Sequence, residues 1–419
     1  MGEEFDRRAF IRLAWSLGLA FSLDACLDSE VPPAPSPPGA PPPPLPVPHY
    51  TSEFGAICDQ LRQVNLGDVT VTTHPWPNGL DAAALIDVDD FCPVYLPGEG
   101  LDFGGNLSGN GILKGFLVDQ LLLASPGAKI CLMTIANMRQ DPLTNSPIAE
   151  DDRFLLSRQG SWVREVNSLL GSFPAIRLGL HGYWHYNYLD HSAREFFQYG
   201  ERAAWNTMAT AHREALEAFP GVEPVFRAPG WGASPTVLRY VAKAGLLLAD
   251  SSATDTYDTS VPSCRPLPDD LRMVRGGPDF ERVIAAQAAR GELIVGHFHF
   301  TAPNANSLGA ESDLGRRNAL GFARAIDGSS TYRIGWLSYA EAGRAVAVAS
   351  ETVWGADLTG TTLSITLENG GAVSSGVTLA VTGLGGRDVL VWDEVGGPIP
   401  FAMKGSARGL DYIVLNPGS

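Results

Sequence analysis

Two adjacent aspartates, Asp89 and Asp90, come directly after the apolar stretch 83–88, which predicts a buried strand. Neighbouring carboxylates at the end of such a strand repel each other and lose hydration, which is costly unless a cation neutralises them. A turn with solvated acids is the alternative for an isolated Asp-Asp pair. The pair therefore indicates a cation site only if other ligands gather around it.

Histidines at the ends of two further predicted strands could supply such ligands. His181 and His185 follow the apolar stretch 176–180, and His297 ends another apolar stretch. Imidazole nitrogens bind zinc and similar metals, and the carboxyl ends of barrel strands meet at one edge. With His299, these residues are four of the eight histidines of the chain. Such clustering is hard to reconcile with histidines that only fill a core.

The elements that must position these residues alternate along residues 50–347. Short apolar runs predict strands, and amphipathic patterns between them predict helices. The predicted strands cover residues 83–88, 130–135, 176–180, 224–226, 246–249 and 293–295, and the predicted helices cover 112–123, 161–170, 193–218 and 235–244. This alternation is typical of an α/β fold with a parallel sheet, either open or closed into a barrel.

Taken in chain order, the motifs resemble the polysaccharide deacetylases of carbohydrate esterase family 4. The series is Asp-Asp at a strand end, His-x-x-x-His, Arg-x-Pro at Arg227, and an apolar strand ending in histidine. The resemblance covers about residues 83–300 and implies a distorted (β/α)7-type barrel. It also implies a hydrolase that removes acetyl groups from an N-acetylated amino-sugar polysaccharide. The implied cofactor is one divalent metal, zinc or else cobalt or nickel, held by Asp90, His181 and His185.

The same resemblance implies roles for the other polar residues. Asp89 would be the general base, Arg227 would orient it, and His297 would be the general acid that protonates the leaving amine. The backbone N–H of Gly230 would stabilise the tetrahedral intermediate. Asp250, after the predicted strand 246–249, would tune His297. Two alternatives stay open, because Asp255 could replace Asp250 and His299 could replace His297.

The sequence departs from the family pattern close to these motifs. Phe91-Cys92-Pro93 stands where Gly-Pro is usual after the acids, and Gly230 precedes Trp231 where an aromatic residue is usual. These departures leave the implied metal ligands in place and concern the substrate. Tyr183, Trp184 and Trp231 could bind substrate by stacking on sugar rings. Packing inside the barrel is the equal alternative for the aromatic residues beside the histidines.

Residues 1–26 indicate an export signal. The pair Arg7-Arg8 precedes the apolar stretch 13–23 and resembles a twin-arginine signal, and Leu-Asp-Ala-Cys ending at Cys26 resembles a lipidation box. An amphipathic N-terminal helix is the alternative. The proline-rich linker 27–49 predicts an extended spacer. These segments predict an exported lipoprotein at the cell surface or in the periplasm, with membrane contact only through the lipid on Cys26.

After about residue 350 the pattern changes to short segments rich in Thr and Val, separated by glycines. Strands are predicted at 361–367, 377–381, 389–392 and 412–415. They predict a small antiparallel β-sandwich over 350–419, an accessory domain that would orient the barrel or bind glycan.

Charge and cysteine content limit the function further. The net charge of −16, from 30 basic and 46 acidic residues without a basic stripe, argues against nucleic acid as a partner. Export permits disulfides, and the cysteines of the body allow three pairings: Cys58, Cys92, Cys131 and Cys264. The alternatives to a deacetylase are a metal-dependent amidase or esterase acting on another acyl group, and a non-catalytic glycan-binding protein on the same scaffold.

Overall fold

The computed structural model describes residues 61–96, 100–102, 112–137, 155–184, 200–229, 234–249, 279–299, 313–368 and 376–417. The predicted export signal and the proline-rich linker lie outside these ranges. So do several predicted site residues and cysteines, namely Cys26, Cys58, His185, Gly230, Trp231, Asp250 and Cys264. Within the described ranges, no helix has both the length and the apolar character needed to cross a bilayer.

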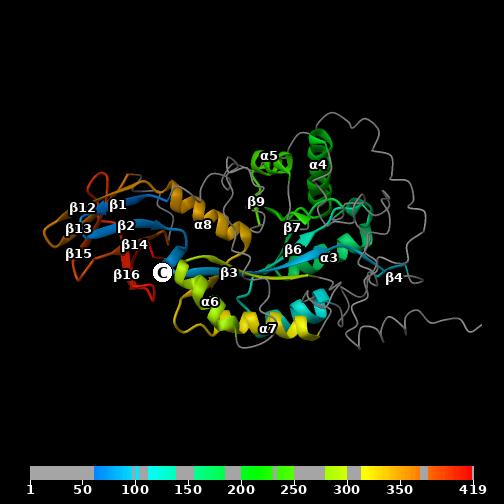
Figure 1. Ribbon diagram of the computed structural model, residues 1–419, viewed down its shortest axis with the longest axis horizontal. Coiled ribbons are helices and arrows are strands. Elements are labelled where there is room, and N and C mark those ends of the chain that lie inside the picture. Colours follow the sequence, from blue (N-terminus) through cyan, green and yellow to red (C-terminus); the bar gives the residue numbers. More distant parts are fainter. Residues whose placement is uncertain are drawn as a thin grey trace, which may run out of the picture. The chain divides into compact units, whose positions relative to one another are not determined.

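A parallel sheet of seven strands forms the centre of the α/β part (Figure 1). Its order is β10-β3-β6-β7-β8-β9, and β11 also pairs with β3. The strands are β3 (Ala82–Phe91), β6 (Ile130–Thr134), β7 (Ile176–Leu180), β8 (Val222–Phe226), β9 (Leu247–Leu248), β10 (Leu293–His299) and β11 (Ile334–Trp336). All of these pairings are parallel, as the α/β prediction requires. Among the described strands, β9 and β10 do not pair, so the described part of the sheet is a curled half-barrel.

Strands β3 and β10 are longer than the apolar stretches that predicted them. Asp89 and Asp90 lie inside β3, and His297 lies inside β10, whereas the sequence placed the aspartates just after a strand. The backbone pairing continues from Leu293↔Ala83 to His299↔Asp89. The β3–β10 ladder continues past the last apolar residues for two reasons. Strand pairing uses main-chain hydrogen bonds, and the polar side chains at this end of the strands contact one another.

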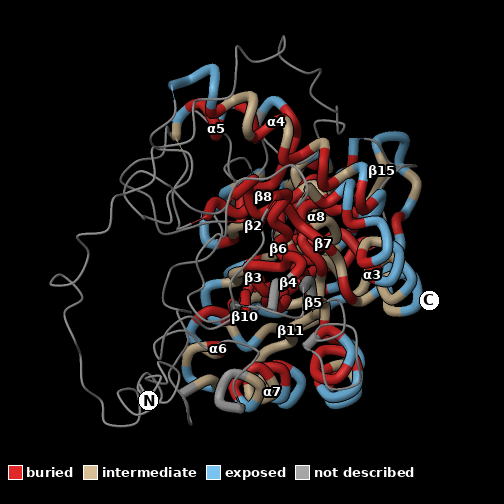
Figure 2. The backbone as a smooth tube through the Cα atoms, turned by 90° about the vertical axis from the view of Figure 1, so that its right-hand side faces the viewer, coloured by how far each residue is buried: buried red, intermediate tan, exposed pale blue. Residues whose placement is uncertain are grey.

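Helices connect the strands. They are η3, a π-helix (Ile112–Leu122), α3 (Gly160–Ser172), α4 (Glu201–Ala218), α5 (Pro235–Ala244), α6 (Asp279–Arg290), α7 (Asp313–Asp327) and α8 (Tyr339–Glu351). The short elements are the turns η2 (Pro77–Gly79) and η5 (Leu156–Arg158) and the hairpin β4 (Val94–Leu96) with β5 (Gly100–Asp102). In Figure 2 the strands β3, β6, β7 and β8 lie in the buried centre, and α7 has a mixed surface.

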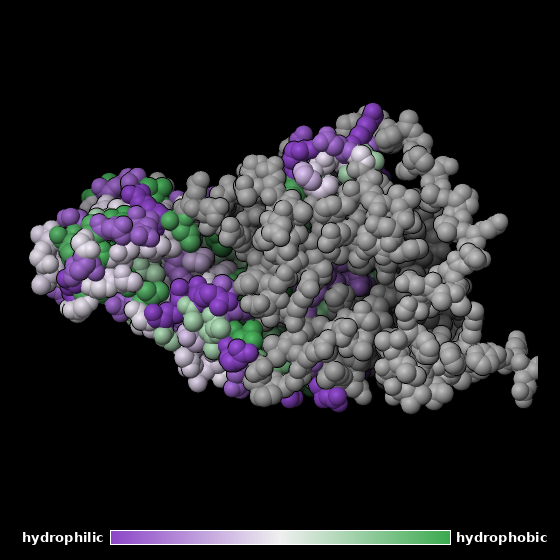
Figure 3. Space-filling model, in the orientation of Figure 1, coloured by the Kyte–Doolittle hydropathy of each residue, from purple (hydrophilic) through white to green (hydrophobic). Residues whose placement is uncertain are grey.

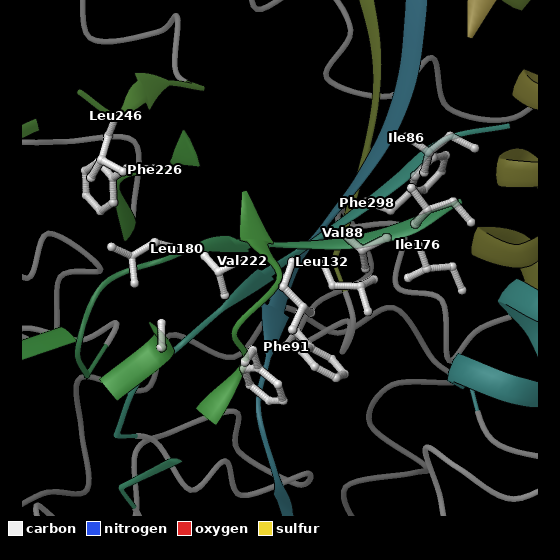
Figure 4. Close-up of a cluster of buried hydrophobic side chains, with 14 of the residues drawn as sticks. Ile86, Val88, Phe91, Leu132, Ile176, Leu180, Val222, Phe226, Leu246 and Phe298 are labelled. Atoms are coloured by element: carbon white, nitrogen blue, oxygen red, sulfur yellow. The ribbon is translucent and has the colours of Figure 1, made fainter. Parts of the chain in front are cut away.

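The two faces of the parallel sheet carry different side chains, because successive residues of a strand point to opposite sides. One set packs against the helices in the main core, as Ile86, Val88, Leu132 and Phe298 do (Figure 4). The other set forms a smaller apolar cluster on the opposite side. That cluster contains Leu85, Cys131, Met133, Val225, Leu247, Ala249, Val295 and Tyr339. This second side is the interior of the half-barrel.

The β-rich part consists of two sheets, β1-β2-β14-β17-β16 and β12-β13-β15. Its strands are β1 (Gln63–Leu66), β2 (Val69–His74), β12 (Trp354–Thr359), β13 (Thr362–Leu367), β14 (Thr378–Thr382), β15 (Asp388–Asp393), β16 (Phe401–Gly405) and β17 (Asp411–Leu415). Both sheets contribute to one apolar cluster, for example through Val71, Leu379 and Ile413 from the first and Ile365 and Val391 from the second. A shared core between two sheets is the architecture of a sandwich.

Two features of this sandwich differ from the prediction. Strands β1 and β2 precede the α/β part in the chain, inside the range 50–347 expected for the barrel, yet β2 pairs with β14 from Thr378↔His74 onward. Strands β13 and β15 pair in parallel, so the sandwich is not purely antiparallel. Both differences depend on pairing between distant segments, which local patterns do not encode.

Hydrogen bonds form where the β-rich part meets the α/β part. The Trp76 indole N–H donates to the Gly291 carbonyl at 2.7 Å, and Arg333 Nη2 donates to the Gly405 carbonyl at 2.7 Å. Beside them, His74 is buried, and its ring stacks on Tyr412 with 4.7 Å between the ring centroids. Burial lowers the pKa of His74 to about 4.

The outer surface of the sandwich is mixed in character. Hydrophobic residues lie scattered among hydrophilic ones in Figure 3. Leu390, Val395 and Met403 are exposed large apolar side chains of this part. The predicted accessory role, orienting the barrel or binding glycan, stays a prediction.

Candidate active site

Strand β3 carries two carboxylates on the interior side of the half-barrel. Asp87 and Asp89 follow Leu85 at intervals of two residues and therefore share its side of the strand. Both are buried, with 0% and 3% of their surface exposed. The alternation of β3 thus places two acids together in a region from which most water is excluded.

Asp90 reaches the same region through a bulge. Val88 pairs with Leu132 and Phe91 pairs with Thr134, so β3 takes three steps where β6 takes two. Asp90 has a φ of 66°, in the left-handed region that side chains other than glycine rarely adopt. Such a conformation costs on the order of 1 kcal/mol and is typical of functional sites. Without the irregularity, the period of the strand would direct Asp90 to the opposite face.

His181 follows β7 and faces the carboxylates of Asp89 and Asp90. Its Nδ1 lies 3.1 Å from the Arg227 carbonyl oxygen. A carbonyl only accepts hydrogen bonds, so Nδ1 carries the proton, and in the neutral ring Nε2 carries the lone pair. Nε2 lies 3.6 Å from Asp89 Oδ2 and 3.5 Å from Asp90 Oδ1. The ring therefore presents a lone pair to two carboxylates.

The spacing between His181 and Asp90 suits two ligands of one metal ion. Ligands about 2.1 Å from a tetrahedral zinc are separated by about 3.4 Å, and the observed separation is 3.5 Å. The donors are an imidazole nitrogen and a carboxylate oxygen, both of which zinc accepts. The residues present therefore fit a divalent metal. His185, the third predicted ligand, lies outside the described residues.

Asp87, Asp89 and His297 form a second group whose donor atoms lie within 4.8 Å of one another. Asp87 is already engaged, because Oδ1 accepts from His297 Nδ1 at 2.7 Å and Oδ2 accepts from Tyr339 and Arg227. A cation bound there would have to displace the Arg227 guanidinium. We therefore favour the side of the site that Asp90 and His181 share.

The charges around Asp87 determine its ionisation. Burial acts to raise the pKa of Asp87, but the positive charge of Arg227 and the contacts with His297 and Tyr339 outweigh burial and hold this pKa well below its ordinary value. Asp87 is therefore an ionised carboxylate in a buried position. It can hold the His297 ring and stabilise a positive charge on it.

Asp89 differs from Asp87 although it lies only two residues away. Burial raises the pKa of Asp89 to about 7, and Asp87 and Asp90 add to the increase, while Arg227 and His297 oppose it. Arg227 Nε lies 3.3 Å from Asp89 Oδ1. Arg227 thus contacts both Asp87 and Asp89, while the sequence suggested only its contact with Asp89. A carboxyl with a pKa close to neutrality is suited to accept and release a proton.

His297 completes the cluster from β10. Strand pairing sets His297 beside Asp87, and Nδ1 carries the proton because the ionised Asp87 can only accept. Nε2 lies 3.6 Å from Asp89 Oδ2. His299, the alternative acid, pairs with Asp89 along the strand, and its side chain lies outside the described residues.

Sequence reasoning missed two residues of the cluster, Asp87 and Tyr339. The spacing Asp87-x-Asp89 within a strand was a usable signal, because it indicates a shared face. Tyr339 follows Ser338 at the start of α8, and no local pattern indicates that its side chain enters the half-barrel. Asp250, the residue predicted to tune His297, lies outside the described residues, and Asp87 occupies the Nδ1 position of His297 in the described part of the site.

Tyr183 and Trp184, predicted to bind sugar, are buried with 8% and 5% of their surface exposed. Their rings contact each other at 4.9 Å between centroids, and the Tyr183 hydroxyl accepts from Asn137 Nδ2 at 3.1 Å. These contacts favour the packing alternative for both residues.

Cys131 carries a free thiol inside the half-barrel. Of the four cysteines for which three disulfide pairings were open, Cys131 therefore forms no disulfide in the structure.

Comparisons with known proteins identify similar folds only at low similarity. No family model matches the chain, and no curated protein matches it. A family 4 carbohydrate esterase from Streptomyces lividans in complex with acetate is 12% identical, with a TM-score of 0.34 over 62% of this chain and 94% of that one. A T48 deacetylase with substrate is 9% identical, with a TM-score of 0.31 over 62% and 90%. A candidate polysaccharide deacetylase from Mycobacterium smegmatis is 12% identical, with a TM-score of 0.37 over 66% and 92%. Similarity at this level carries no argument about activity, which depends on the site itself.

Proposed function

We propose that the chain is a metal-dependent hydrolase that removes acetyl groups from an N-acetylated amino-sugar polysaccharide. One observation carries this proposal: Asp89 Oδ2 lies 3.6 Å from Nε2 of His181 and 3.6 Å from Nε2 of His297. A single carboxylate oxygen thus lies between a histidine suited to bind a metal and a histidine suited to donate a proton. Metal-assisted hydrolysis of an amide uses a bound ion, a general base and a general acid around one carbon atom.

Asp90 and His181, with His185 from outside the described residues, would hold the metal. Three protein ligands leave a coordination position open, as a catalytic zinc requires. When bound, the ion would polarise the acyl carbonyl and lower the pKa of a water molecule. Zinc suits the nitrogen and carboxylate ligands, and cobalt or nickel are alternatives.

Asp89 would act as the general base. It would take a proton from the attacking water while the new C–O bond forms at the acetyl carbon. Arg227, 3.3 Å from Asp89 Oδ1, favours the charged form of this buried acid. The backbone N–H of Gly230 is the proposed donor to the oxygen that becomes negative, and Trp231 beside it would contact the sugar.

His297 would act as the general acid. As the C–N bond breaks, the protonated ring would give its Nε2 proton to the amine nitrogen of the sugar, which leaves poorly as an anion. The ionised Asp87 stabilises the positive ring, with Oδ1 2.7 Å from Nδ1. The role of tuning His297, first given to Asp250, is in this proposal carried at least in part by Asp87.

The proposed location is outside the cytoplasm, where polysaccharide substrates occur. The arginine pair Arg7-Arg8 would direct export, and Cys26 would carry a lipid that anchors the protein through the proline-rich linker. Partition of wild type and Cys26→Ser between detergent and water tests the lipid separately. Equal partition of the two proteins would exclude lipidation while leaving export possible.

The test of the function is acetate release by protein reconstituted with zinc. N-acetylglucosamine oligomers, peptidoglycan fragments and an N-acetylated exopolysaccharide serve as substrates, with chelated protein and Asp89→Asn as controls. Release from at least one N-acetylated substrate, absent in both controls, supports the proposal. Acetate release from O-acetylated sugars alone would favour an esterase. Metal-bound protein that releases no acetate from any of the N-acetylated substrates would contradict the proposal.

A further inference from the structure

The first turn of helix α8 (Tyr339–Glu351) is held in place by several contacts. Ser338 and Glu341 form a capping box, in which Glu341 N donates to Ser338 Oγ at 3.2 Å and Ser338 N donates to Glu341 Oε2 at 2.7 Å. Ala340 N also donates to Glu223 Oε2 on β8 at 3.3 Å. Capping fixes the direction in which a helix begins. The residue inside this turn, Tyr339, therefore has a defined position relative to β8.

Tyr339 extends into the interior of the half-barrel. Its side chain is 1% exposed and belongs to the same apolar cluster as Leu85 and Val295. Its hydroxyl donates to Asp87 Oδ2 at 2.7 Å and accepts from Arg227 Nη2 at 3.3 Å. The buried hydroxyl of Tyr339 therefore has a partner both as a donor and as an acceptor. Helix α8, far from β3 in the sequence, thus reaches the carboxylate of Asp87.

The Asp87 carboxylate consequently accepts hydrogen bonds from three side chains. Tyr339 and Arg227 occupy Oδ2, and His297 Nδ1 occupies Oδ1. Contacts on both oxygens prevent rotation of the carboxylate, so Oδ1 stays where it holds the His297 ring. Because Nδ1 is held there, Nε2 faces Asp89 and the space where a leaving group would lie.

We propose that Tyr339 is a positioning residue for the reaction: through Asp87 it fixes the tautomer and the orientation of His297 for proton donation to the leaving group. The proposal rests on the function proposed above. Tyr339 touches neither substrate nor metal in this assignment. Its effect on the reaction passes through Asp87, and its removal leaves Arg227 as the remaining donor to Asp87 Oδ2.

Leaving groups distinguish this role from a merely structural one. An N-acetylated sugar needs a proton on its departing amine, whereas 4-nitrophenyl acetate releases a stable phenolate without one. Loss of a hydrogen bond to a charged group lowers an equilibrium or rate constant by about 10-fold or more. Tyr339→Phe should therefore lower kcat on the amide substrate by about 10-fold. KM should change little, because the acid acts in the transition state. Turnover of the aryl ester should stay near that of wild type.

Asp87→Asn should show the same selectivity with a larger effect. The uncharged amide can no longer stabilise the positive ring, so the amide reaction should lose about 10²–10⁴-fold, the contribution of a general acid. The matched control is Tyr240→Phe, because Tyr240 is also fully buried and its hydroxyl contacts His212 Nδ1 at 3.1 Å, outside the site. Tyr240→Phe should leave the ratio of amide to ester turnover at the wild-type value.

A spectroscopic measurement keeps the proposal testable even if no substrate is turned over. The Nδ1 proton of a histidine bonded to a carboxylate resonates far downfield, and the chain has eight histidines to assign. This signal of His297 should shift in Tyr339→Phe and stay unchanged in Tyr240→Phe. An unchanged signal in Tyr339→Phe, or equal losses on amide and ester, would overturn the positioning role. Inactive wild type with the expected shift would instead contradict the proposed function alone.

Discussion

Asp89 and His297 face each other across the parallel strands β3 and β10 with 3.6 Å between Asp89 Oδ2 and His297 Nε2. This distance is longer than that of a normal hydrogen bond. Asp87 holds the far side of the His297 ring at 2.7 Å. In the proposed mechanism, this arrangement separates an acid and a base on one edge of the sheet, close enough for both to serve one reacting group.

Replacing the proposed base gives the most direct prediction about the mechanism. Asp89→Asn keeps the size of the side chain and leaves Asp90 and His181 in place. We expect acetate release to fall by about 10²–10⁴-fold, the contribution of general-base catalysis. The bound zinc, measured by elemental analysis, should stay near the wild-type amount. An Asp89→Asn protein that turns over at the wild-type rate with its metal bound would contradict the assigned role.

Much of the site could be predicted from the sequence because parallel strands bring their carboxyl ends together. Asp89, Asp90, His181 and His297 each lie at or near the end of an apolar stretch, and the structure brings them within about 4 Å of a neighbour in the cluster. Arg227 was found in the same way, after β8. The pattern behind this expectation is local, namely where an apolar run meets a charged residue.

The remaining features depend on geometry that local patterns do not contain. The side to which Asp90 points depends on the bulge opposite Leu132 and Thr134. The position of Tyr339 depends on helix capping and on contacts with β3 and β8, which are distant in the sequence. Pairing of β2 with β14 is likewise a contact between the two ends of the described chain. Such long-range contacts follow from the whole fold and not from a window of residues.

The predicted export can be tested by charge-conserving substitutions. Arg7→Lys together with Arg8→Lys keeps two positive charges before the apolar stretch 13–23. A twin-arginine signal is recognised by receptor and not by charge alone, so the double variant should stay in the cytoplasm. Fractionation of cells followed by immunoblotting measures this. Replacement of Lys114 by Arg, far from the signal, is the control, and unchanged export of the double variant would remove the prediction.

Removal of a proposed ligand should empty the metal site. Reconstituted wild type should bind about one zinc, and His181→Ala should bind it far more weakly, because its Nε2 faces Asp90 at 3.5 Å. His212→Gln is the matched control, since His212 is also a fully buried histidine but contacts Tyr240 on α5. Isothermal titration with zinc compares the three proteins. Equal zinc affinity of His181→Ala and wild type would contradict the proposed ligand set.

His74 should make the protein sensitive to acid. Burial lowers the pKa of His74 to about 4, whereas an unfolded histidine takes up its proton near pH 6.5. Between these values the unfolded state binds more protons, so stability is full above about pH 6.5 and is lost as the pH falls toward 4. The loss from this residue should be on the order of 2–3 kcal/mol. In His74→Gln, whose amide can still donate to the Leu80 carbonyl, urea unfolding at pH 7.5 and 5 should differ less than in wild type.

Asp89 should have the opposite effect on the metal-free protein. Burial raises the pKa of Asp89 to about 7, whereas an unfolded aspartate loses its proton near pH 4. Between these values the folded state binds more protons, so stability from this group is present below about pH 4 and is lost as the pH rises through about 7.

Asp89→Asn lacks this buried charge and should therefore be more stable than wild type at pH 7.5, by about 1–3 kcal/mol, but not at pH 4.5. Urea unfolding in the presence of a chelator measures the difference, and Asp119→Asn, which alters an exposed acid paired with Lys114, is the control. Zinc should reduce the difference at pH 7.5, because a cation beside Asp89 neutralises its charge. If chelated wild type and Asp89→Asn unfold at the same urea concentration at both pH values, Asp89 does not carry the buried charge that its surroundings indicate, and its assignment as a base poised near neutral pH fails with it.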